Sequence, residues 1–136
     1  MSDLDLCYMP AHEALRLFKA KRLSPVELMQ ATIRRAEATR SSINCFTFTH
    51  FEEAMKLAAR AEAKYARGAR TGALEGLPTG IKDESYIKGK PTSHGSLLSR
   101  DAVGGHTSTM NERIMKAGGI VHARTATPEF SCAGYT

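Results

Sequence analysis

The sequence predicts an α/β fold in which helices dominate the first half and short strands and loops dominate the second half. All eleven glycines lie between Gly68 and Gly134, so the first 67 residues contain none. Glycine is costly inside helices and useful in turns, and this distribution predicts a helical segment over residues 1–67 and a strand and loop segment over residues 68–136. In the second segment a helix pattern, a glycine turn, a short apolar strand and a polar loop alternate, as in a sheet flanked by helices.

Three helices are predicted in the first segment, over residues 10–21, 24–39 and 51–66. The second has the clearest start, because Ser24 is an N-cap residue followed by a proline, and Glu27 is placed to reach back in a capping box. Apolar residues recur at helical spacing in all three segments. The expected buried faces are Ala11, Leu15 and Phe18 in the first helix, Met29, Ile33 and Ala36 in the second, and Phe51, Ala54, Ala58, Ala61 and Tyr65 in the third.

About four short strands are expected, and three of them are clear: residues 44–49, 79–81 and 120–123. A fourth helix, capped by Thr107 or Ser108, precedes the last strand. Its expected inward residues are Met110, Ile114 and Ala117, and Gly118 and Gly119 are expected to end it. So few strands leave exposed edges, which predicts an incomplete sheet and an isolated chain of low stability.

The composition is that of a globular protein with one modest domain. A chain of 136 residues is long enough to bury about 68% of its unfolded surface. The net charge is +5, and the basic excess lies in residues 1–70, where lysine and arginine alternate with glutamate at helical spacing. This pattern is typical of a solvated helix face, so we expect no direct nucleic-acid binding.

The cysteines and the N-terminus indicate a cytoplasmic protein. Cys7, Cys45 and Cys132 are odd in number and widely spaced, which suggests neither a disulfide framework nor a zinc ribbon. The N-terminus is acidic where a signal peptide is basic. No apolar run approaches the ~20 residues of a membrane span, and we expect no membrane association.

Lys82 is the candidate catalytic residue, because it follows the apolar strand 79–81 where a glycine- and proline-rich turn begins. Such junctions project side chains into the crevice where α/β proteins bind ligands. A lysine acts as a base only when it is neutral, which requires desolvation or a neighbouring cation. Asp83 opposes this, unless strand alternation turns its carboxylate to the other face. From these residues alone, a surface ion pair is the favoured role for Lys82, and catalysis is the alternative.

The segment around Lys82 resembles the region of the catalytic lysine in the amidase signature family. The residues that carry this resemblance are Gly76-Leu77-Pro78, Lys82-Asp83, Gly89, Pro91-Thr92 and Gly95-Ser96. The helix start at Leu23–Leu28 and the run Ala117–Phe130 also look like family segments. The resemblance therefore spans about residues 10–136.

The resemblance implies the N-terminal portion of a single amidase domain over residues 1–136, with an incomplete amidase signature fold whose sheet is mixed. It also implies hydrolysis of a carboxamide by a Ser-Ser-Lys triad, with Lys82 as the general base and no cofactor. The family's two serines follow downstream of Thr136, so the 136-residue chain alone is expected to be inactive. The implied partner is a small-molecule or acyl amide substrate, and a homo-oligomer is left open.

The sequence differs from the family pattern at two positions, and two other functions are considered beside amide hydrolysis. Arg124 stands where the family usually has lysine, and Ala126 where it usually has asparagine; both leave Lys82 untouched. One alternative is an amidotransferase subunit that supplies ammonia for transfer to glutamyl-tRNA. The other is a non-catalytic interaction module.

The remaining candidate residues are expected to be structural. None of the loop serines lies in a Gly-x-Ser-x-Gly elbow; these are Ser85, Ser93, Ser96, Ser99 and Ser131. Thr92 and Ser96 are expected at the rim of the pocket. The histidines show no ligand spacing, so no metal is expected. Gly104-Gly105 is interpreted as a flexible connection, and Phe130 as a buried ring that anchors a turn.

Overall fold

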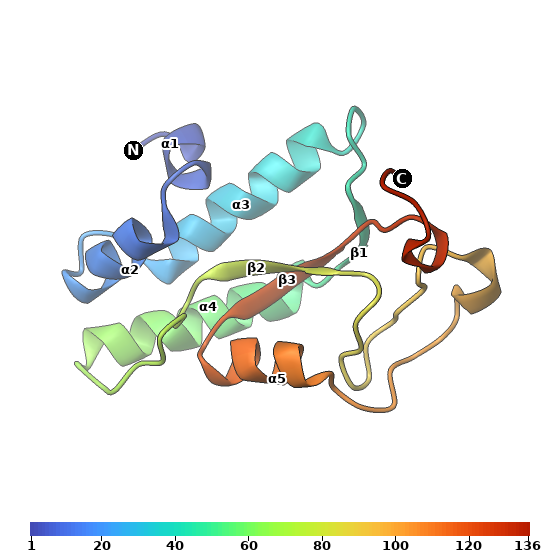
Figure 1. Ribbon diagram of the computed structural model, residues 1–136. Helices are drawn as coiled ribbons and strands as arrows, with labels where there is room; N and C mark the ends of the chain where they lie inside the picture. Colours follow the sequence, from blue (N-terminus) through green and yellow to red (C-terminus); the bar gives the residue numbers. More distant parts are fainter.

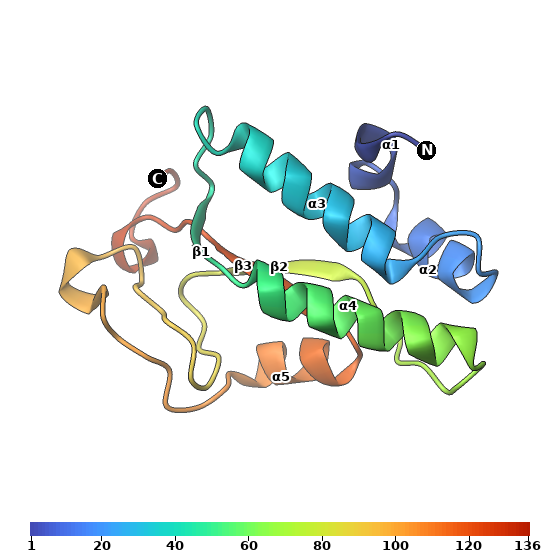
Figure 2. The same ribbon diagram turned by 180° about the vertical axis from the view of Figure 1, so that it is seen from behind.

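The computed structural model describes residues 1–136 and shows a small mixed sheet surrounded by helices (Figure 1). The elements in chain order are α1 (Asp3–Cys7), α2 (Ala11–Lys19), α3 (Pro25–Thr39), β1 (Phe46–Thr49), α4 (Phe51–Ala66), β2 (Pro78–Lys82), a 3-10 turn (Leu97–Ser99), α5 (Thr109–Lys116), β3 (Ile120–Thr125) and a second 3-10 turn (Glu129–Ser131). Helix α4 lies between α3 and α5 when the molecule is seen from behind (Figure 2). No helix combines the length and the apolar character that a membrane crossing requires.

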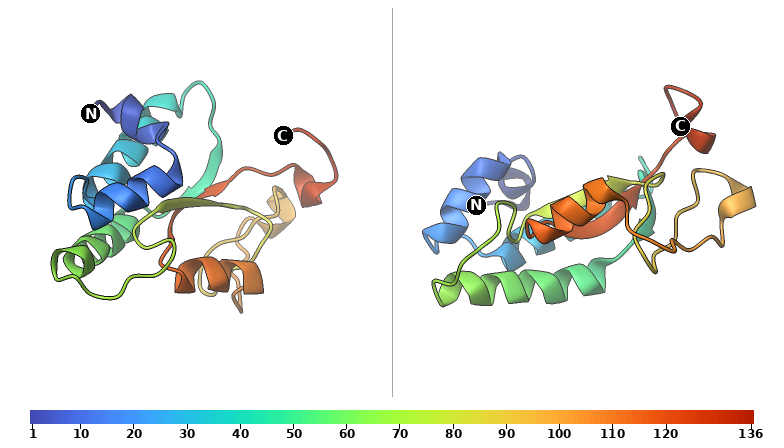
Figure 3. Two further views of the ribbon diagram at one scale, coloured as in Figure 1. Left: turned by 60° about the vertical axis from the view of Figure 1, so that its left-hand side comes forward. Right: turned by 60° about the horizontal axis from the view of Figure 1, so that its bottom comes forward.

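The sheet has three strands in the order β1-β3-β2. Strand β1 pairs antiparallel with β3, and β2 pairs parallel with β3, so that Lys82 lies opposite Thr125. The expected α/β class and mixed sheet are therefore confirmed, but the expected fourth strand is wrong. The chain between β2 and α5 forms loops joined by a single bridge between Pro91 and Val103. These loops and the C-terminal turn lie beyond the same end of the sheet (Figure 3).

The helix starts follow local sequence signals. Ser24 caps α3: its hydroxyl accepts the Val26 N–H at 2.9 Å, and Glu27 accepts the Ser24 N–H at 2.8 Å. This reciprocal pair satisfies two backbone donors that have no partner within the helix, and it confirms the predicted capping box. Helix α4 has the predicted bounds. Helix α1 was not predicted, although Ser2 and Asp5 form a capping box there too.

Two predicted helix faces are wrong in detail. In α2 the buried residues are Ala14, Leu17 and Phe18, whereas Ala11 is exposed. In α5 Met110 is 55% exposed and its neighbour Asn111 is fully buried. The Asn111 amide donates to the Ser85 hydroxyl at 3.0 Å and to the Tyr86 carbonyl at 2.9 Å. Helix α5 therefore packs on a polar loop with a polar residue, which a search for apolar periodicity cannot detect.

The contact between α3 and α4 depends on small side chains. Ala54 and Ala58 of α4 are fully buried in one cluster with Met29 of α3 and Ile120 of β3. Alanine at these positions lets the two helices and the sheet approach closely, and packed interiors leave little spare volume.

We expect Ala58→Leu to lower the free energy of unfolding by about 1–3 kcal/mol, because the added atoms must displace packed neighbours. Urea denaturation of the 136-residue chain measures this effect. Ala59→Leu is the matched control, since Ala59 is the exposed neighbour on the same helix. Equal effects of the two substitutions would show that α4 is not packed as described.

Candidate active site

Lys82 is the last residue of β2, and its amine takes part in a cluster of polar side chains beyond the end of the sheet. Its Nζ donates to Glu84 Oε2 and to Ser131 Oγ, each at 3.1 Å. The Ser131 hydroxyl donates to Glu84 and lies 3.1 Å from Thr127 Oγ1. The structure thus joins a lysine amine to a serine hydroxyl that is 49 positions away in the sequence.

The Lys82 cluster is open to water. The side chains of Lys82 and Glu84 are 43% and 42% exposed. A hydrogen bond from Ser131 and, to a smaller extent, one from Lys82 lower the pKa of the Glu84 carboxyl below its usual value. Glu84 is therefore an anion beside the Lys82 amine. The structure thus places Lys82 in an exposed ion pair with Glu84.

Asp83 points away from Lys82 into the protein. Its carboxylate is fully buried and accepts the Ser93 N–H at 3.0 Å together with the Ser93 hydroxyl. Arg124 Nη2 lies 3.7 Å from Asp83 Oδ1. The strand alternation that turns the Asp83 carboxylate away from Lys82 is therefore confirmed. Asp83 organises the following loop instead of acting on Lys82.

Arg124, one of the two departures from the family pattern, is the largest fully buried side chain. Its Nη2 donates to the Ser85 carbonyl and lies 3.5 Å from Thr92 Oγ1, while its Nε and Nη1 have no partner. Burial lowers the pKa of the Arg124 guanidinium, and the nearby Asp83 carboxylate opposes this change. Arg124 thus connects β3 to two positions, Ser85 and Thr92, of the loop that follows Lys82.

The loop residues Thr92, Ser93 and Ser96 are buried, and the hydroxyl of each makes a hydrogen bond. The Ser96 hydroxyl accepts the Leu98 N–H at 3.2 Å and donates to Glu129 Oε1 at 2.6 Å. The Thr92 hydroxyl thus meets Arg124 of β3 and the Ser96 hydroxyl meets Glu129 of the C-terminal turn, so both join the loop to other parts of the chain.

One expectation about the C-terminal turn is wrong, and one contact in it was not foreseen. Ser131, expected to be structural, contacts Lys82 directly. The Phe130 ring is 51% exposed and stacks on His94 at a centroid distance of 6.4 Å, so it is not buried. No local sequence signal places Ser131 beside Lys82, because the contact depends on the pairing of β2 with β3 and on the turn after it.

The turn that carries Ser131 rests on Gly95. Gly95 has a φ of +68°, and a Cβ atom there would lie 2.3 Å from the Thr127 carbonyl oxygen. Gly89 has a φ of +76° but open space around its Cα. Both positions adopt the left-handed conformation that glycine favours. Only Gly95 also lacks the room for a side chain.

We expect Gly95→Ala to destabilise the chain by about 1 kcal/mol more than Gly89→Ala, because it adds a backbone clash to the same conformational cost. Thermal unfolding of the two variants gives this difference. An equal loss of stability in both would mean that the loop and the C-terminal turn do not touch at Gly95.

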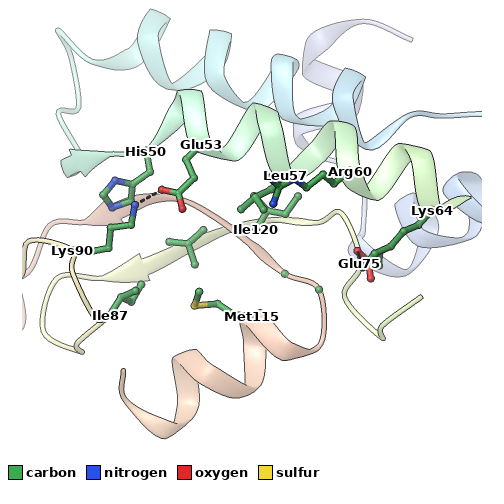
Figure 4. A pocket seen from close by; sticks show the side chains of 13 residues that line it. His50, Glu53, Leu57, Arg60, Lys64, Glu75, Ile87, Lys90, Met115 and Ile120 are labelled. Atoms are coloured by element: carbon green, nitrogen blue, oxygen red, sulfur yellow. Dashed lines mark hydrogen bonds and ion pairs between the residues drawn. The ribbon is translucent and has the colours of Figure 1, made fainter. Parts of the chain in front are cut away.

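A separate groove of about 330 Å³ lies between α4, α5 and β3 (Figure 4). Leu57, Ile120 and Met115 contribute apolar surface, and the Glu53–Lys90 and Lys64–Glu75 ion pairs lie along it. Lys82 does not line this groove. No group of three or more histidine, cysteine, aspartate or glutamate side chains is arranged to hold a metal ion.

Known proteins resemble this chain in sequence and in structure. The family model for amidases matches residues 27–136. A glutamyl-tRNA(Gln) amidotransferase subunit from Carboxydothermus hydrogenoformans is 31% identical over 98% of this chain and 27% of its own length. The acylamidase of Rhodococcus erythropolis is 30% identical over the whole chain and 28% of its own length. The chain thus spans about a quarter of these curated relatives.

Solved structures agree with the sequence comparison. A bacterial aryl acylamidase of the amidase signature enzymes has a TM-score of 0.84 and 28% identity, covering 90% of this chain and 26% of that structure. A fatty acid amide hydrolase shares the fold, with a TM-score of 0.85 and 24% identity over 93% of this chain and 22% of that structure. The motif around Lys82, the family match over residues 27–136 and the shared fold agree, and the chain belongs to the amidase signature family.

Proposed function

We propose that this chain supplies Lys82 as the general base of an amide hydrolase that uses a Ser-Ser-Lys triad. The observation that carries the proposal is the position of Lys82, which ends strand β2 beside β3 and lies in the motif that resembles the family's catalytic-lysine region. Its amine lies 3.1 Å from Ser131 Oγ, so a side-chain hydroxyl can come as close to it as general-base catalysis requires, although Ser131 itself accepts from Lys82 and donates to Glu84.

In the proposed mechanism, neutral Lys82 takes a proton from a bridging serine. That serine takes the proton of a second, nucleophilic serine, whose oxygen attacks the carbonyl carbon of the amide. The C–N bond breaks, the nitrogen leaves as ammonia or an amine with the transferred proton, and water releases the acyl group. This is the lysine version of the activated-serine mechanism. Both serines are supplied by polypeptide outside the 136 residues, so the chain alone is expected to be inactive.

The substrate class is a linear carboxamide, and the similarity to an acylamidase supports it. The similarity to an amidotransferase subunit supports a second candidate, in which the ammonia is passed to glutamyl-tRNA within a complex. The two differ in what they require, because the hydrolase works by itself and the amidotransferase needs partner chains.

The experiment that tests the proposal is an amide hydrolysis assay on a version extended through the family's serine loop. We expect release of ammonia or amine from simple aliphatic and aryl amides without any added partner. Activity that appears only with partner chains and glutamyl-tRNA would support the amidotransferase. A version that includes both serines and hydrolyses no amide under either condition would contradict the proposal.

A further inference from the structure

We propose that Glu84 and Ser131 are positioning residues that hold the Lys82 amine in a closed arrangement, from which it must be released before it can take a proton from a catalytic serine. This inference rests on the proposed function, because it concerns the availability of the same amine. It adds two residues outside the Lys82 motif's catalytic role that determine whether the amine is available.

The closed arrangement is a triangle of three polar groups. Lys82 Nζ lies 3.1 Å from both Glu84 Oε2 and Ser131 Oγ, and the Ser131 hydroxyl donates to Glu84. Thr127 Oγ1, 3.1 Å from Ser131 Oγ, supports the serine from the other side. A lysine ammonium has three donors and no acceptor, and two of these donors are engaged here.

The Ser131 oxygen occupies a position that a catalytic hydroxyl requires. A serine that gives its proton to Lys82 must approach the amine within hydrogen-bond distance, and Ser131 already occupies one such direction. Glu84 acts in the same sense, because its carboxylate accepts from the same amine and forms an ion pair with it. Release of both contacts therefore frees the amine to meet another hydroxyl.

The backbone holds Ser131 in place. Phe130 and Ser131 have φ values of 48° and 57°, in the left-handed region that residues other than glycine seldom adopt. The Phe130 N–H donates to the His94 carbonyl and the Ser131 N–H to the Pro128 carbonyl, each at 2.8 Å. Ser131 thus reaches Lys82 from a turn fixed by one hydrogen bond within it and one to His94 of the preceding loop, and a change in that turn would withdraw the hydroxyl.

Residue-resolved acetylation of the 136-residue chain tests this proposal without any substrate. Acetic anhydride reacts with amines that are neutral and accessible, and mass spectrometry of peptides gives a rate for each lysine at one fixed pH. Lys88 is the internal reference, because it is exposed and its hydrogen bond to Thr107 is made by its backbone N–H and not by its amine. The measured quantity is the rate at Lys82 divided by the rate at Lys88.

We expect Glu84→Gln to raise this ratio by about twofold to fivefold, the range expected for loss of an exposed ion pair. Ser131→Ala should also raise it, and the double variant should show less than the product of the two effects, because both residues contact one amine. Glu52→Gln, at an exposed position of α4, should leave it unchanged. A ratio that stays unchanged in either single variant would overturn the proposal.

The result separates this inference from the proposed function. If the ratio does not respond, the closed arrangement is absent, and the role of Lys82 as a base still depends on the activity of the extended version. If the ratio responds but the extended version without Lys82 keeps its activity, the arrangement exists and the proposed function is wrong. Equal thermal unfolding of the variants and the unsubstituted chain excludes a general loosening of the fold as the cause.

Discussion

Asp83→Ala is expected to lower the free energy of unfolding by about 3–5 kcal/mol, because it leaves the Arg124 guanidinium buried without its counter-charge. Both side chains are fully buried, and two nitrogens of Arg124 already lack a hydrogen-bond partner. The substitution also removes the acceptor for the Ser93 N–H and hydroxyl. Since a domain is stable by only about 5–15 kcal/mol in total, most of the chain should unfold under mild denaturant.

Urea denaturation followed by circular dichroism measures this effect. Glu84→Ala is the matched control, because Glu84 is the next residue and its carboxylate is exposed. The double variant Asp83→Ala with Arg124→Met should recover part of the loss, since it removes the unpaired charge together with its partner. A loss below about 1 kcal/mol in Asp83→Ala would mean that the buried pair is not formed.

Lys82→Ala, in a version extended through the family's serine loop, is expected to reduce kcat/KM for amide hydrolysis by about 10²–10⁴-fold, the range for loss of a general base. Without the amine no group accepts the proton of the bridging serine, so the nucleophilic serine cannot be activated. Lys82→Arg should be nearly as inactive, because a guanidinium keeps its charge at every pH the protein tolerates. Lys88→Ala, a nearby exposed lysine, should retain full activity.

The features that local signals specify could be predicted from the sequence. The capping box at Ser24 fixed the start of α3, and the alanine-rich period of α4 gave its bounds. The position of Lys82 at a strand end followed from a short apolar run before a turn. The sequence left the direction of Asp83 open, and the structure shows the alternation of side chains that the period of two residues in a strand makes possible.

The features that depend on distant contacts could not be predicted. Ser131 meets Lys82 across 49 positions, through the pairing of two strands and a strained turn. Arg124 looked like a simple departure from a family pattern, yet it is buried against the loop that starts at Asp83. Asn111 replaced the apolar contact expected from Met110, because the surface beneath α5 is a polar loop. In each case a partner that is distant in the sequence determines where the side chain lies.

A single-turnover experiment on the extended version compares the rate of ammonia or amine release between Lys82→Ala and the unsubstituted protein. This first chemical step should slow by at least about 10² in the variant, while substrate binding is retained. An unchanged rate of release in Lys82→Ala would show that another group takes the proton, and it would contradict the assignment of Lys82 as the general base.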